Sequence, residues 1–502
     1  MGLTSASPIM SARLAPAATG ALLMISGAVV IALIALAGGY GYHRDELYFL
    51  AAGEHLAIGY PDQGPLTPAI AALMSAIAPD SLTVLRVPAA LSTAAIVFLA
   101  GLLARELGAG QRAQLLASAI TAVGAIFLIT GHILSTTTFD LLAWTSVCLL
   151  VVRLLRGGDP RLWLLVGAIF GLALLNKPLV VFLAAALLAG LLAVGPRQVL
   201  RTPWPYLGGL IALALWSPWL IWQAQHGWPQ LQVADSIASG ASTSSEPGWA
   251  FLPFQFLLVS PLLAPVWIAG LLALFRRPAL RPFRSLGVCW VLLAIAFMIT
   301  KGKPYYIAGM FPVLIAAGAL ELDRWLAQGQ AALRRGALGV AIAVSAMVSA
   351  IIGLPILPVS SSEPVLAINE DIGETIGWPE FTRTVATAVA KRRPDPREPV
   401  IVTTNYGQAG AIDRYGPELG LPRAYSGHNG YWYWGPPSGS GPVLAVGFRR
   451  AELERRFVGC RPVGTISTPD RVDNEEDGTP LTLCAGPAEP WDRLWPKLER
   501  LG

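Results

Sequence analysis

Three acidic residues stand close together in a short polar stretch between two long apolar segments. Asp45 and Glu46 are adjacent, and Asp62 follows in "GYPDQGPLTP", a turn rich in proline and glycine. A carboxylate can remove the proton of a hydroxyl group while that hydroxyl attacks a carbon atom. Such a reaction also needs cations that stabilise the charge on the departing group.

Cations and further polar residues recur at the borders of other apolar segments. The set comprises Arg86, His132, Asp140, Lys177, Lys301, Lys303, Tyr305 and Tyr306. Arginine and lysine are the usual partners of a phosphate that leaves as its bond breaks. Ionisable residues collected at one face of a membrane indicate a site that handles a charged lipid headgroup.

Each of these residues also has a purely structural interpretation. The two lysines could extend their ammonium groups to the interface, and the two tyrosines could anchor the chain there. Asp140 follows Thr138 and could cap a helix. His132 and His226 are more typical of hydrogen-bonded loop histidines than of metal ligands. Asp45 could be a solvated interfacial charge.

The composition indicates a membrane protein. The 502 residues are 54% hydrophobic and 13% charged, and the mean hydropathy is +0.56. Low charge with long apolar runs is typical of helical membrane proteins. The net charge of +5 comes from arginines in short loops, so we expect no nucleic-acid partner. The sequence has no zinc-finger spacing, Walker loop or Rossmann glycine pattern.

The apolar runs predict about eleven membrane spans, with a re-entrant pair as an alternative around 161–194. The runs are 18–39, 83–103, 114–131, 139–155, 161–175, 178–194, 206–223, 250–275, 285–300, 304–320 and 336–357. Arginine-rich loops alternate with arginine-poor ones, which by the positive-inside rule predicts a cytoplasmic N-terminus and an extracytoplasmic C-terminus. Residues 1–357 are therefore predicted to form a transmembrane domain. Its first outer loop is 40–82, and a flexible outer loop is expected at 224–249.

The outer loop at 40–82 and the C-terminal region contain predicted soluble elements. Residues 44–59 suit an amphipathic helix lying on the membrane surface. From 358 to 502 no run could span a bilayer. "PVIVTTNYGQAGAIDRYGP" reads as a buried strand and a helix, and "GPVLAVGF" as a second strand. We expect a small extracytoplasmic α/β domain there.

The cysteines fall into two classes. Cys148 and Cys289 lie in apolar runs and read as buried hydrophobic residues. Cys460 and Cys484 lie in the C-terminal region, and we expect them to form a disulfide in an oxidising outer compartment. The aromatic stretch "HNGYWYWGPP" (428–437) suits either a surface that stacks on sugars or a turn that closes a small domain.

Several motifs together resemble a known family. The Asp-Glu pair, "GYPDQGPLTP", "LRVPAALS" (85–92), "STTTFDLLAW" (135–144), "LLNKP" (174–178) and "KGKPYYIAGMFP" (301–312) occur in the family's order. They are similar to the polytopic glycosyltransferases of family 39, which include protein mannosyltransferases and aminoarabinose transferases. The resemblance covers roughly 40–325 and implies an α-helical polytopic GT-C fold and a polyprenyl-phosphate sugar donor.

The resemblance assigns roles to residues of this chain. Asp45 matches the catalytic carboxylate, and Glu46 accompanies it as an orienting partner. Asp62 matches a second acid that binds acceptor or a divalent metal, Mg²⁺ or Mn²⁺. The residues expected to contact the carrier phosphate are Arg86, Lys301, Lys303, Tyr305 and Tyr306, with support from Asp140, His132 and Lys177. Gly64 and Gln63 depart from the family pattern, which weakens any claim for aminoarabinose transfer.

The sequence therefore predicts an enzyme that moves a hexosyl or pentosyl group to a hydroxyl of a glycan, lipid or protein acceptor at the outer face. The alternative is a transporter or flippase of a lipid-linked saccharide. That class is typically built from repeats with broken helices near the membrane midplane, and neither feature is evident in the sequence. A non-catalytic scaffold would not require Asp45 beside the cations.

Overall fold

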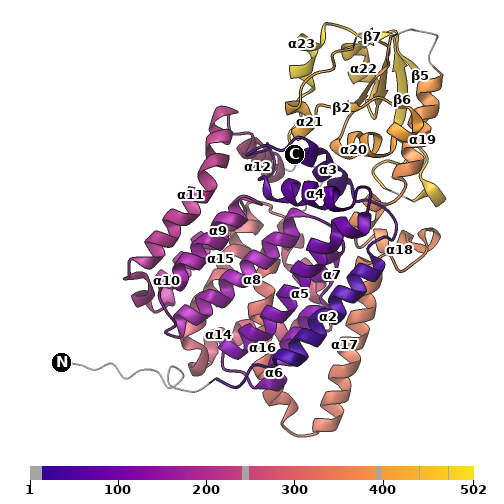
Figure 1. Ribbon diagram of the computed structural model, residues 1–502. Helices are drawn as coiled ribbons and strands as arrows, with labels where there is room; N and C mark the ends of the chain where they lie inside the picture. The colour runs from indigo at the N-terminus through magenta and orange to yellow at the C-terminus, as the bar shows by residue number, and fades with distance from the viewer. Residues whose placement is uncertain (1–13, 240–247, 392–396, 440, 473) are drawn as a thin grey trace. The chain divides into compact units, whose positions relative to one another are not determined.

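The computed structural model describes residues 14–239, 248–391, 397–439, 441–472 and 474–502 (Figure 1). The chain divides into two compact units. The first unit comprises Met1–Ala37, Arg86–Trp222 and Ile237–Leu354, and the second comprises Gly38–Leu85, Gln223–Ser236 and Pro355–Gly502. The second unit therefore joins the polar loop after the first apolar helix to the C-terminal region, whereas the sequence grouped that loop with the membrane domain.

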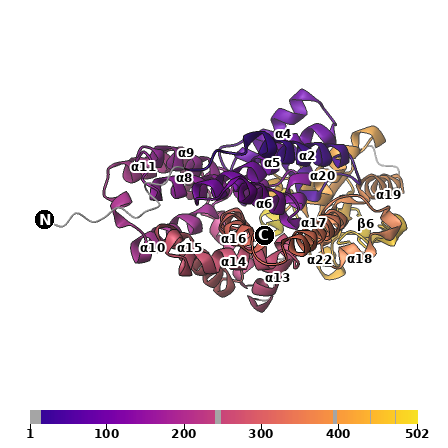
Figure 2. The same ribbon diagram turned by 90° about the horizontal axis from the view of Figure 1, so that it is seen from below.

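The first unit is a bundle of apolar helices (Figures 1 and 2). In the view from below, α8 and α9 lie along one side of the bundle and α10 and α15 along the other. The longer helices are α2 (Thr19–Leu36), α5 (Leu82–Glu106, which begins in the second unit), α8 (Thr136–Leu155), α11 (Trp204–Gln225), α15 (Arg284–Ile299), α16 (Phe311–Leu326) and α17 (Ala331–Gly353). The shorter helices are α6 (Gln111–Ala122), α7 (Ala125–His132), α9 (Leu162–Leu174), α10 (Val180–Val194), α13 (Phe251–Val259) and α14 (Ala264–Arg276). The 3₁₀ turns are η1 (Arg197–Leu200), η2 (Gly248–Ala250), η3 (Pro278–Phe283) and η4 (Pro304–Met310).

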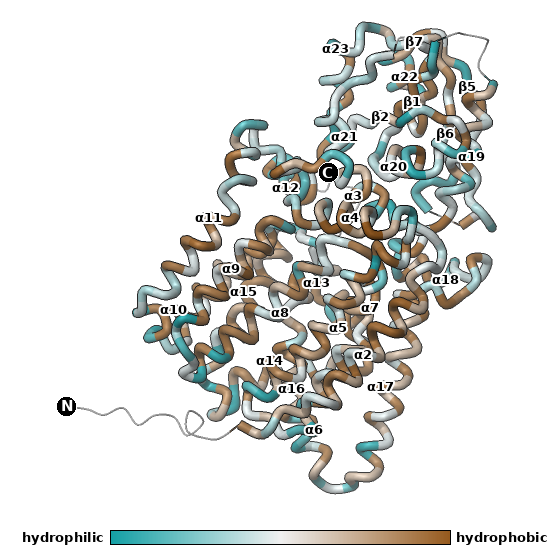
Figure 3. The backbone as a smooth tube through the Cα atoms, in the orientation of Figure 1, coloured by the Kyte–Doolittle hydropathy of each residue, from teal (hydrophilic) through white to brown (hydrophobic). Residues whose placement is uncertain are grey.

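Hydropathy along these helices matches a membrane environment, with apolar residues along their lengths and polar residues mostly in the connecting turns (Figure 3). Seven helices of the described residues are long and apolar enough to cross a bilayer, or up to nine if two bent pairs each count as one span. The predicted count of about eleven is therefore not confirmed. Helices α9 and α10 have only 13 and 15 residues, below the length that a straight span needs.

Close helix packing in the first unit depends on small residues. A Cβ atom at Gly270 of α14 would lie 1.9 Å from the Leu314 carbonyl oxygen of α16. A Cβ at Gly318 of α16 would lie equally close to the Val266 carbonyl oxygen of α14. The two backbones can approach because both helices present glycine at the contact, as is common between membrane helices.

The second unit combines short helices with two β-sheets. Its helices are α3 (Arg44–Glu54), α4 (Leu66–Ile77), α12 (Pro229–Ser239, whose end belongs to the first unit), α18 (Glu363–Leu366), α19 (Trp378–Ala390), α20 (Tyr406–Tyr415), α21 (Gly430–Tyr433), α22 (Arg450–Arg456) and α23 (Trp491–Leu494). Its 3₁₀ turns are η5 (Val359–Ser361), η6 (Glu370–Thr375), η7 (Pro417–Leu419), η8 (Pro469–Arg471) and η9 (Trp495–Leu498). Its strands are β1 (Val400–Thr403), β2 (Ala424–Ser426), β3 (Val443–Val446), β4 (Phe457–Val458), β5 (Arg461–Thr465), β6 (Pro480–Cys484) and β7 (Gly486–Pro487).

The main sheet has the order β2-β1-β3-β6-β5, and β4 pairs with β7 separately. Strand β1 is parallel to β2 and β3, whereas β3–β6 and β6–β5 are antiparallel. Every residue of β1 and β3 is buried, which is typical of strands covered on both faces. Helices α19 and α20 pack on the sheet, and a core that includes Phe448, Phe457 and Trp495 packs against Val402 and Ala445. The predicted fold class, a helical polytopic protein with a small C-terminal α/β domain, is confirmed.

The predicted helix after the first span is α3, and it ends at Glu54. His43 caps it by accepting a hydrogen bond from the Asp45 N–H, and the Glu46 side chain accepts one from the His43 N–H. Its apolar residues Leu47 and Ala51 are buried, because α3 packs on α4 and α20. Leu47 and Ala51 of the predicted apolar face thus contact protein, whereas Leu56, beyond the end of α3, is exposed. The place of α3 on the membrane surface stays a prediction.

Two further predictions concern loops and cysteines. The flexible loop expected at 224–249 contains helix α12 over Pro229–Ser239, while its residues 240–247 lie outside the described part of the chain.

Cys460 and Cys484 form the predicted disulfide, which joins the start of β5 to the end of β6. Cys148 and Cys289 are free and buried, as expected.

Candidate active site

Asp45 lies in the first turn of α3, in the second unit. Its side chain is 36% exposed. The Tyr406 hydroxyl donates a hydrogen bond of 2.8 Å to Asp45 Oδ1, and the Arg44 Nε lies 4.0 Å from the same oxygen. The carboxylate is therefore held by a tyrosine and a guanidinium while about a third of the side chain stays accessible. That is the arrangement expected of a positioned base.

Tyr406 begins α20, and Asn405 caps that helix by accepting from the Gln408 N–H. Burial and the nearby charge of Asp45 raise the pKa of Tyr406 well above 10, so its hydroxyl keeps its proton and remains a donor. The ring stacks on Tyr48 at 4.7 Å between centroids, and the Arg44 guanidinium lies 5.7 Å from its centre. These contacts fix the hydroxyl that orients Asp45.

Asp62 lies in the turn before α4 and uses both carboxylate oxygens. The Tyr48 hydroxyl donates to Oδ1 at 2.9 Å, and the Asn429 amide donates to Oδ2 at 3.1 Å. Burial, with a smaller contribution from the negative charge of Asp45, raises the pKa of Asp62 to about 7. Asp45 and Asp62 are thus linked through the stacked rings of Tyr48 and Tyr406, and Asp62 changes charge near neutral pH.

The resemblance implied that Glu46 orients Asp45, whereas Glu46 forms a hydrogen bond with the backbone of His43. It is fully buried, and its carboxylate accepts a hydrogen bond of 2.8 Å from the His43 backbone N–H. This contact completes the capping box at the start of α3. Glu46 therefore orients the helix that carries Asp45.

A group of acids surrounds Arg44, and no sequence pattern predicted it. Arg44 forms ion pairs with Glu475 and with Glu374, whose Oε2 lies 3.5 Å from the Arg44 Nε. Burial raises the pKa of Glu374 to about 8 although Arg44 opposes the shift. Glu476 accepts hydrogen bonds from Asn405 and Gln408. Arg44 thus ties Asp45 to the C-terminal part of the unit.

The raised pKa of Glu374 predicts a pH-dependent stability. Because the folded pKa of about 8 lies above the unfolded value of 4.5, the unfolded chain binds fewer protons between these pH values. Stability then falls as pH rises through that window. We expect the unfolding temperature in detergent to fall between pH 5 and 8, and Glu374→Gln to reduce that slope. An unchanged slope in the variant would contradict the assignment; the exposed Glu454→Gln serves as the control.

In the first unit, Lys177, Lys303, Tyr305 and Tyr306 come together. The Lys177 Nζ lies 4.8 Å from the ring centre of Tyr306 and 5.4 Å from that of Tyr305, and the Lys303 Nζ lies 6.0 Å from Tyr305. Lys177 also donates to the Thr137 hydroxyl at 3.4 Å. Two ammonium groups held by two tyrosine rings form a concentrated positive charge, which we call the lysine–tyrosine cluster.

Asp140 lies inside α8 rather than at its start. The cap of α8 is Ser135, which accepts from the Thr138 N–H, so the capping interpretation of Asp140 is wrong. Asp140 is 3% exposed and accepts a hydrogen bond of 3.0 Å from the Trp144 indole N–H. Lys177 is close enough to interact with its charge. Asp140 thus supports the lysine–tyrosine cluster from α8.

Arg86 and Lys301, the other two cations expected to contact the phosphate, lie outside the lysine–tyrosine cluster. Arg86 is 1% exposed, and its Nη1 donates to the Ala37 carbonyl at 2.8 Å and lies 3.1 Å from the His132 Nε2. This environment favours a structural role for Arg86 and His132, joining α5 to the ends of α2 and α7. Lys301 is exposed and has a φ of 52° at the turn before η4.

Asp62 is the acid that the resemblance assigned to a divalent metal, and each of its oxygens accepts one hydrogen bond from a protein donor. Among the described residues, no group of three or more His, Cys, Asp or Glu side chains is arranged to hold a metal ion. No catalytic step is therefore assigned to Mg²⁺ or Mn²⁺.

Sequence reasoning did not identify Tyr406, Asn429 or Arg44. Tyr406 and Asn429 lie more than 360 positions from the acids that they contact, and only the strand-turn-helix pattern of "VTTNYGQAGA" marked the first. The aromatic stretch 428–437 is used largely for packing. Tyr431 is buried, and Trp434 stacks on His55 at 4.5 Å.

The fold and the first polar loop define a class of protein, the polytopic membrane proteins of GT-C fold. Residues 62–222 match the profile of the dolichyl-phosphate-mannose-protein mannosyltransferase family, about a third of the chain. The expected resemblance is confirmed over that segment, and the chain is a multi-pass membrane protein.

Two solved structures resemble this chain over most of its length. ArnT from Cupriavidus metallidurans bound to undecaprenyl phosphate superposes with a TM-score of 0.59 at 17% identity, over 93% of this chain and 98% of that one. The apo state of the same protein gives 0.57 at 16% identity, over the same shares. At these identities the likeness is one of fold. Among curated proteins, none matches the chain.

Proposed function

We propose that this protein is a membrane glycosyltransferase that moves a sugar from a polyprenyl-phosphate carrier to an acceptor hydroxyl. The observation that carries the proposal is Asp45, a partly exposed carboxylate held by Tyr406 and Arg44 in a chain of GT-C fold. The carrier is supported by the similar structure, which binds undecaprenyl phosphate, and by the family whose name specifies dolichyl phosphate.

The reaction is a single displacement. Asp45 accepts the proton of the acceptor hydroxyl as its oxygen forms a bond to the anomeric carbon. The bond from that carbon to the phosphate oxygen breaks, and its electron pair leaves with the polyprenyl phosphate. Attack opposite the leaving group inverts the anomeric configuration. Tyr406 keeps its proton and orients Asp45 throughout, because its raised pKa prevents ionisation.

We assign the donor phosphate to the lysine–tyrosine cluster of the first unit. Lys177 and Lys303 supply two positive charges, and Tyr305 and Tyr306 hold them in place. Arg86 is left out of this assignment because its guanidinium is enclosed. The exposed Lys301 is left out because the two tyrosine rings hold Lys177 and Lys303.

The orientation in the membrane is part of the proposal. The arginine-rich loops favour a cytoplasmic N-terminus and an extracytoplasmic location of residues 358–502, where the donor would be used. Arg281→Cys lies in one of these loops, and the native cysteines are either buried or bonded. We expect an impermeant thiol reagent on intact cells to leave Arg281→Cys unlabelled and to label the exposed Glu454→Cys. Labelling of Arg281→Cys from outside would contradict the orientation.

The transferred group is a hexosyl or pentosyl residue, and a carrier panel identifies it. Purified protein in liposomes is incubated with polyprenyl-phosphate mannose, galactose, arabinose and aminoarabinose, and products are read by mass spectrometry. The proposal expects at least one carrier to be converted to free polyprenyl phosphate with transfer of its sugar. If every carrier survives intact but crosses the bilayer, the protein is the flippase of the alternative hypothesis.

A further inference from the structure

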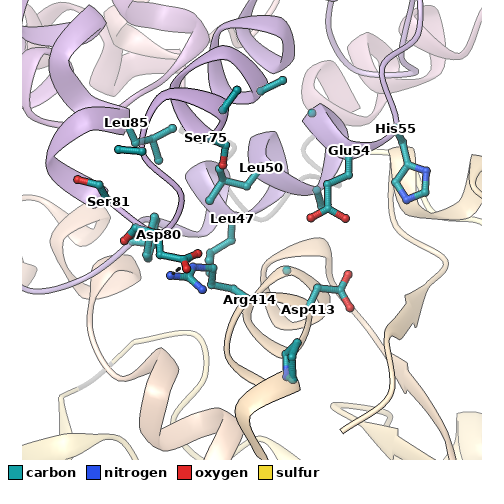
Figure 4. A pocket seen from close by; sticks show the side chains of 18 of the residues that line it. Leu47, Leu50, Glu54, His55, Ser75, Asp80, Ser81, Leu85, Asp413 and Arg414 are labelled. Carbon is teal, nitrogen blue, oxygen red and sulfur yellow. Dashed lines mark hydrogen bonds and ion pairs between the residues drawn. The ribbon is translucent and has the colours of Figure 1, made fainter. Parts of the chain in front are cut away.

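A cavity of about 620 Å³ lies within the second unit (Figure 4). Helices α3 and α4 line it on one side, and α20 with the turn that follows lines it on the other. Leu47, Leu50 and Ala51 of α3 provide an apolar wall. Glycine lets these helices meet, since a Cβ at Gly410 of α20 would lie 2.9 Å from the Leu47 Cβ. The cavity is large enough for a ligand of several rings.

The same two helices carry the candidate base. Asp45 lies in the first turn of α3 and Tyr406 begins α20; neither lines the cavity, whose lining on α3 runs from Leu47 to Glu54. Glu54, at the end of α3, is about 13 Å from Asp45 along the helix axis. A ligand that reaches from the Glu54 end of the cavity to Asp45 is therefore longer than a single sugar ring.

Polar groups around the cavity are arranged in pairs. Arg414 lies 3.0 Å from Asp80, and Arg423 lies 2.7 Å from Glu54. Asp80, Glu54 and Arg423 are all more than 60% exposed, and exposed ion pairs contribute little stability. A ligand hydroxyl can replace one partner of such a pair at low cost.

Asp413 is the most enclosed of these acids. Its Oδ1 accepts from the Ala424 N–H and its Oδ2 from the Tyr431 hydroxyl. A carboxylate has about four acceptor positions, so two remain for a ligand. Burial raises the pKa of Asp413 to about 6, which is common for acids in binding pockets.

This combination favours a neutral ligand rich in hydroxyl groups. Hydroxyls both donate to carboxylates and accept from guanidinium groups, while the apolar wall suits the C–H face of a sugar ring. An anionic headgroup would meet four carboxylates and two guanidinium groups that are already paired. A lipid chain would leave the charged rim without partners.

From these contacts we infer that the cavity of the second unit binds the body of a glycan acceptor, whose terminal hydroxyl reaches Asp45. The inference rests on the proposed transferase function and narrows its acceptor from glycan, lipid or protein to a glycan longer than one sugar. The acceptor body is held by the walls of α3, α4 and α20.

The test uses the full-length protein in detergent with Asp45→Asn, so that binding is measured without turnover. The probes are linear mannan, galactan and arabinan oligosaccharides of two to six units, titrated by calorimetry. Ala76→Trp places a large ring at an exposed cavity position of α4, and Ala69→Trp places the same ring at an exposed α4 position outside the cavity. Neither residue is buried, so folding should be retained.

We expect at least one oligosaccharide series to bind, more tightly with three or more units than with two. Ala76→Trp should raise its Kd by about tenfold or more, as expected when a pocket loses its space, and Ala69→Trp should leave the Kd unchanged. Equal Kd values for the two variants, or binding of a lysine-rich peptide instead of any oligosaccharide, would overturn the inference. So would the absence of binding by every oligosaccharide. Because the assay needs no transfer, a protein that binds glycan but transfers no sugar would contradict only the proposed function.

Discussion

Asp45→Asn should lower sugar transfer by at least about a hundredfold, because removal of a general base typically costs 10²–10⁴ in rate. Asparagine keeps the size of the side chain and can still accept the Tyr406 hydrogen bond, but it cannot take the acceptor proton. We therefore expect the variant to fold and to bind the polyprenyl-phosphate donor with unchanged affinity. Transfer of labelled sugar in detergent, with donor binding measured separately, checks both expectations.

Three variants accompany that experiment. The exposed Asp492→Asn, in the same unit, should leave transfer unchanged. Tyr406→Phe should lower the rate by about tenfold or more, because a hydrogen bond to a charged group is lost, and leave donor affinity unchanged. Glu46→Gln should have a milder effect, because glutamine can still accept from the His43 N–H. Near-normal transfer by Asp45→Asn would contradict the assignment, and the base would then be sought at Asp62.

Lys303→Met and Lys177→Met should each weaken donor binding as well as slow the reaction. The phosphate carries charge before and during bond breaking, so a lost cation affects both states. A hydrogen bond to a charged group contributes about 1.5–3 kcal/mol, which corresponds to a loss of roughly 10- to 150-fold in kcat/KM for each lysine. Titration of donor lipid, together with initial rates, separates the two effects.

The matched control is Lys497→Met. Lys497 is exposed and pairs with Glu489 at the surface of the second unit, so its loss should change neither donor affinity nor rate. Lys301 is exposed and lies outside the lysine–tyrosine cluster. We therefore expect Lys301→Met to lower donor affinity and rate less than Lys303→Met does. If Lys303→Met and Lys177→Met bind the donor as tightly as the native protein, the lysine–tyrosine cluster does not hold the phosphate.

Much of the helical fold follows from the apolar runs, because burial in lipid demands long apolar helices. The number of spans could not be obtained this way. The run 250–275 is apolar throughout, yet it forms α13 and α14, which are bent by 111° at Ser260–Leu263. Pro261 and Pro265 were the only local signal of that break. Hydropathy measures solvent preference and does not report helix direction.

The carboxylates and lysines of the candidate site were predictable from residue type and from their place beside apolar runs. Their partners were not. Tyr406 and Asn429 reach Asp45 and Asp62 only through the fold of the C-terminal region, which no pattern near the acids encodes. Arg86 shows the converse, because a cation at a predicted helix border proved to be enclosed and bonded to Ala37 and His132. Burial of a charged side chain depends on packing that sequence alone does not give.

The most direct test of the proposed function is stoichiometric transfer in proteoliposomes that contain a polyprenyl-phosphate sugar labelled in both the sugar and the lipid, with a hydroxyl acceptor outside. The carrier panel identifies which sugar to use. The proposal predicts that one polyprenyl phosphate is released for each sugar joined to the acceptor, with inverted anomeric configuration, and that Asp45→Asn lowers the rate of formation of both products by at least about a hundredfold. Recovery of sugar and lipid still joined, with the lipid moved across the bilayer equally by the native protein and Asp45→Asn, would contradict it.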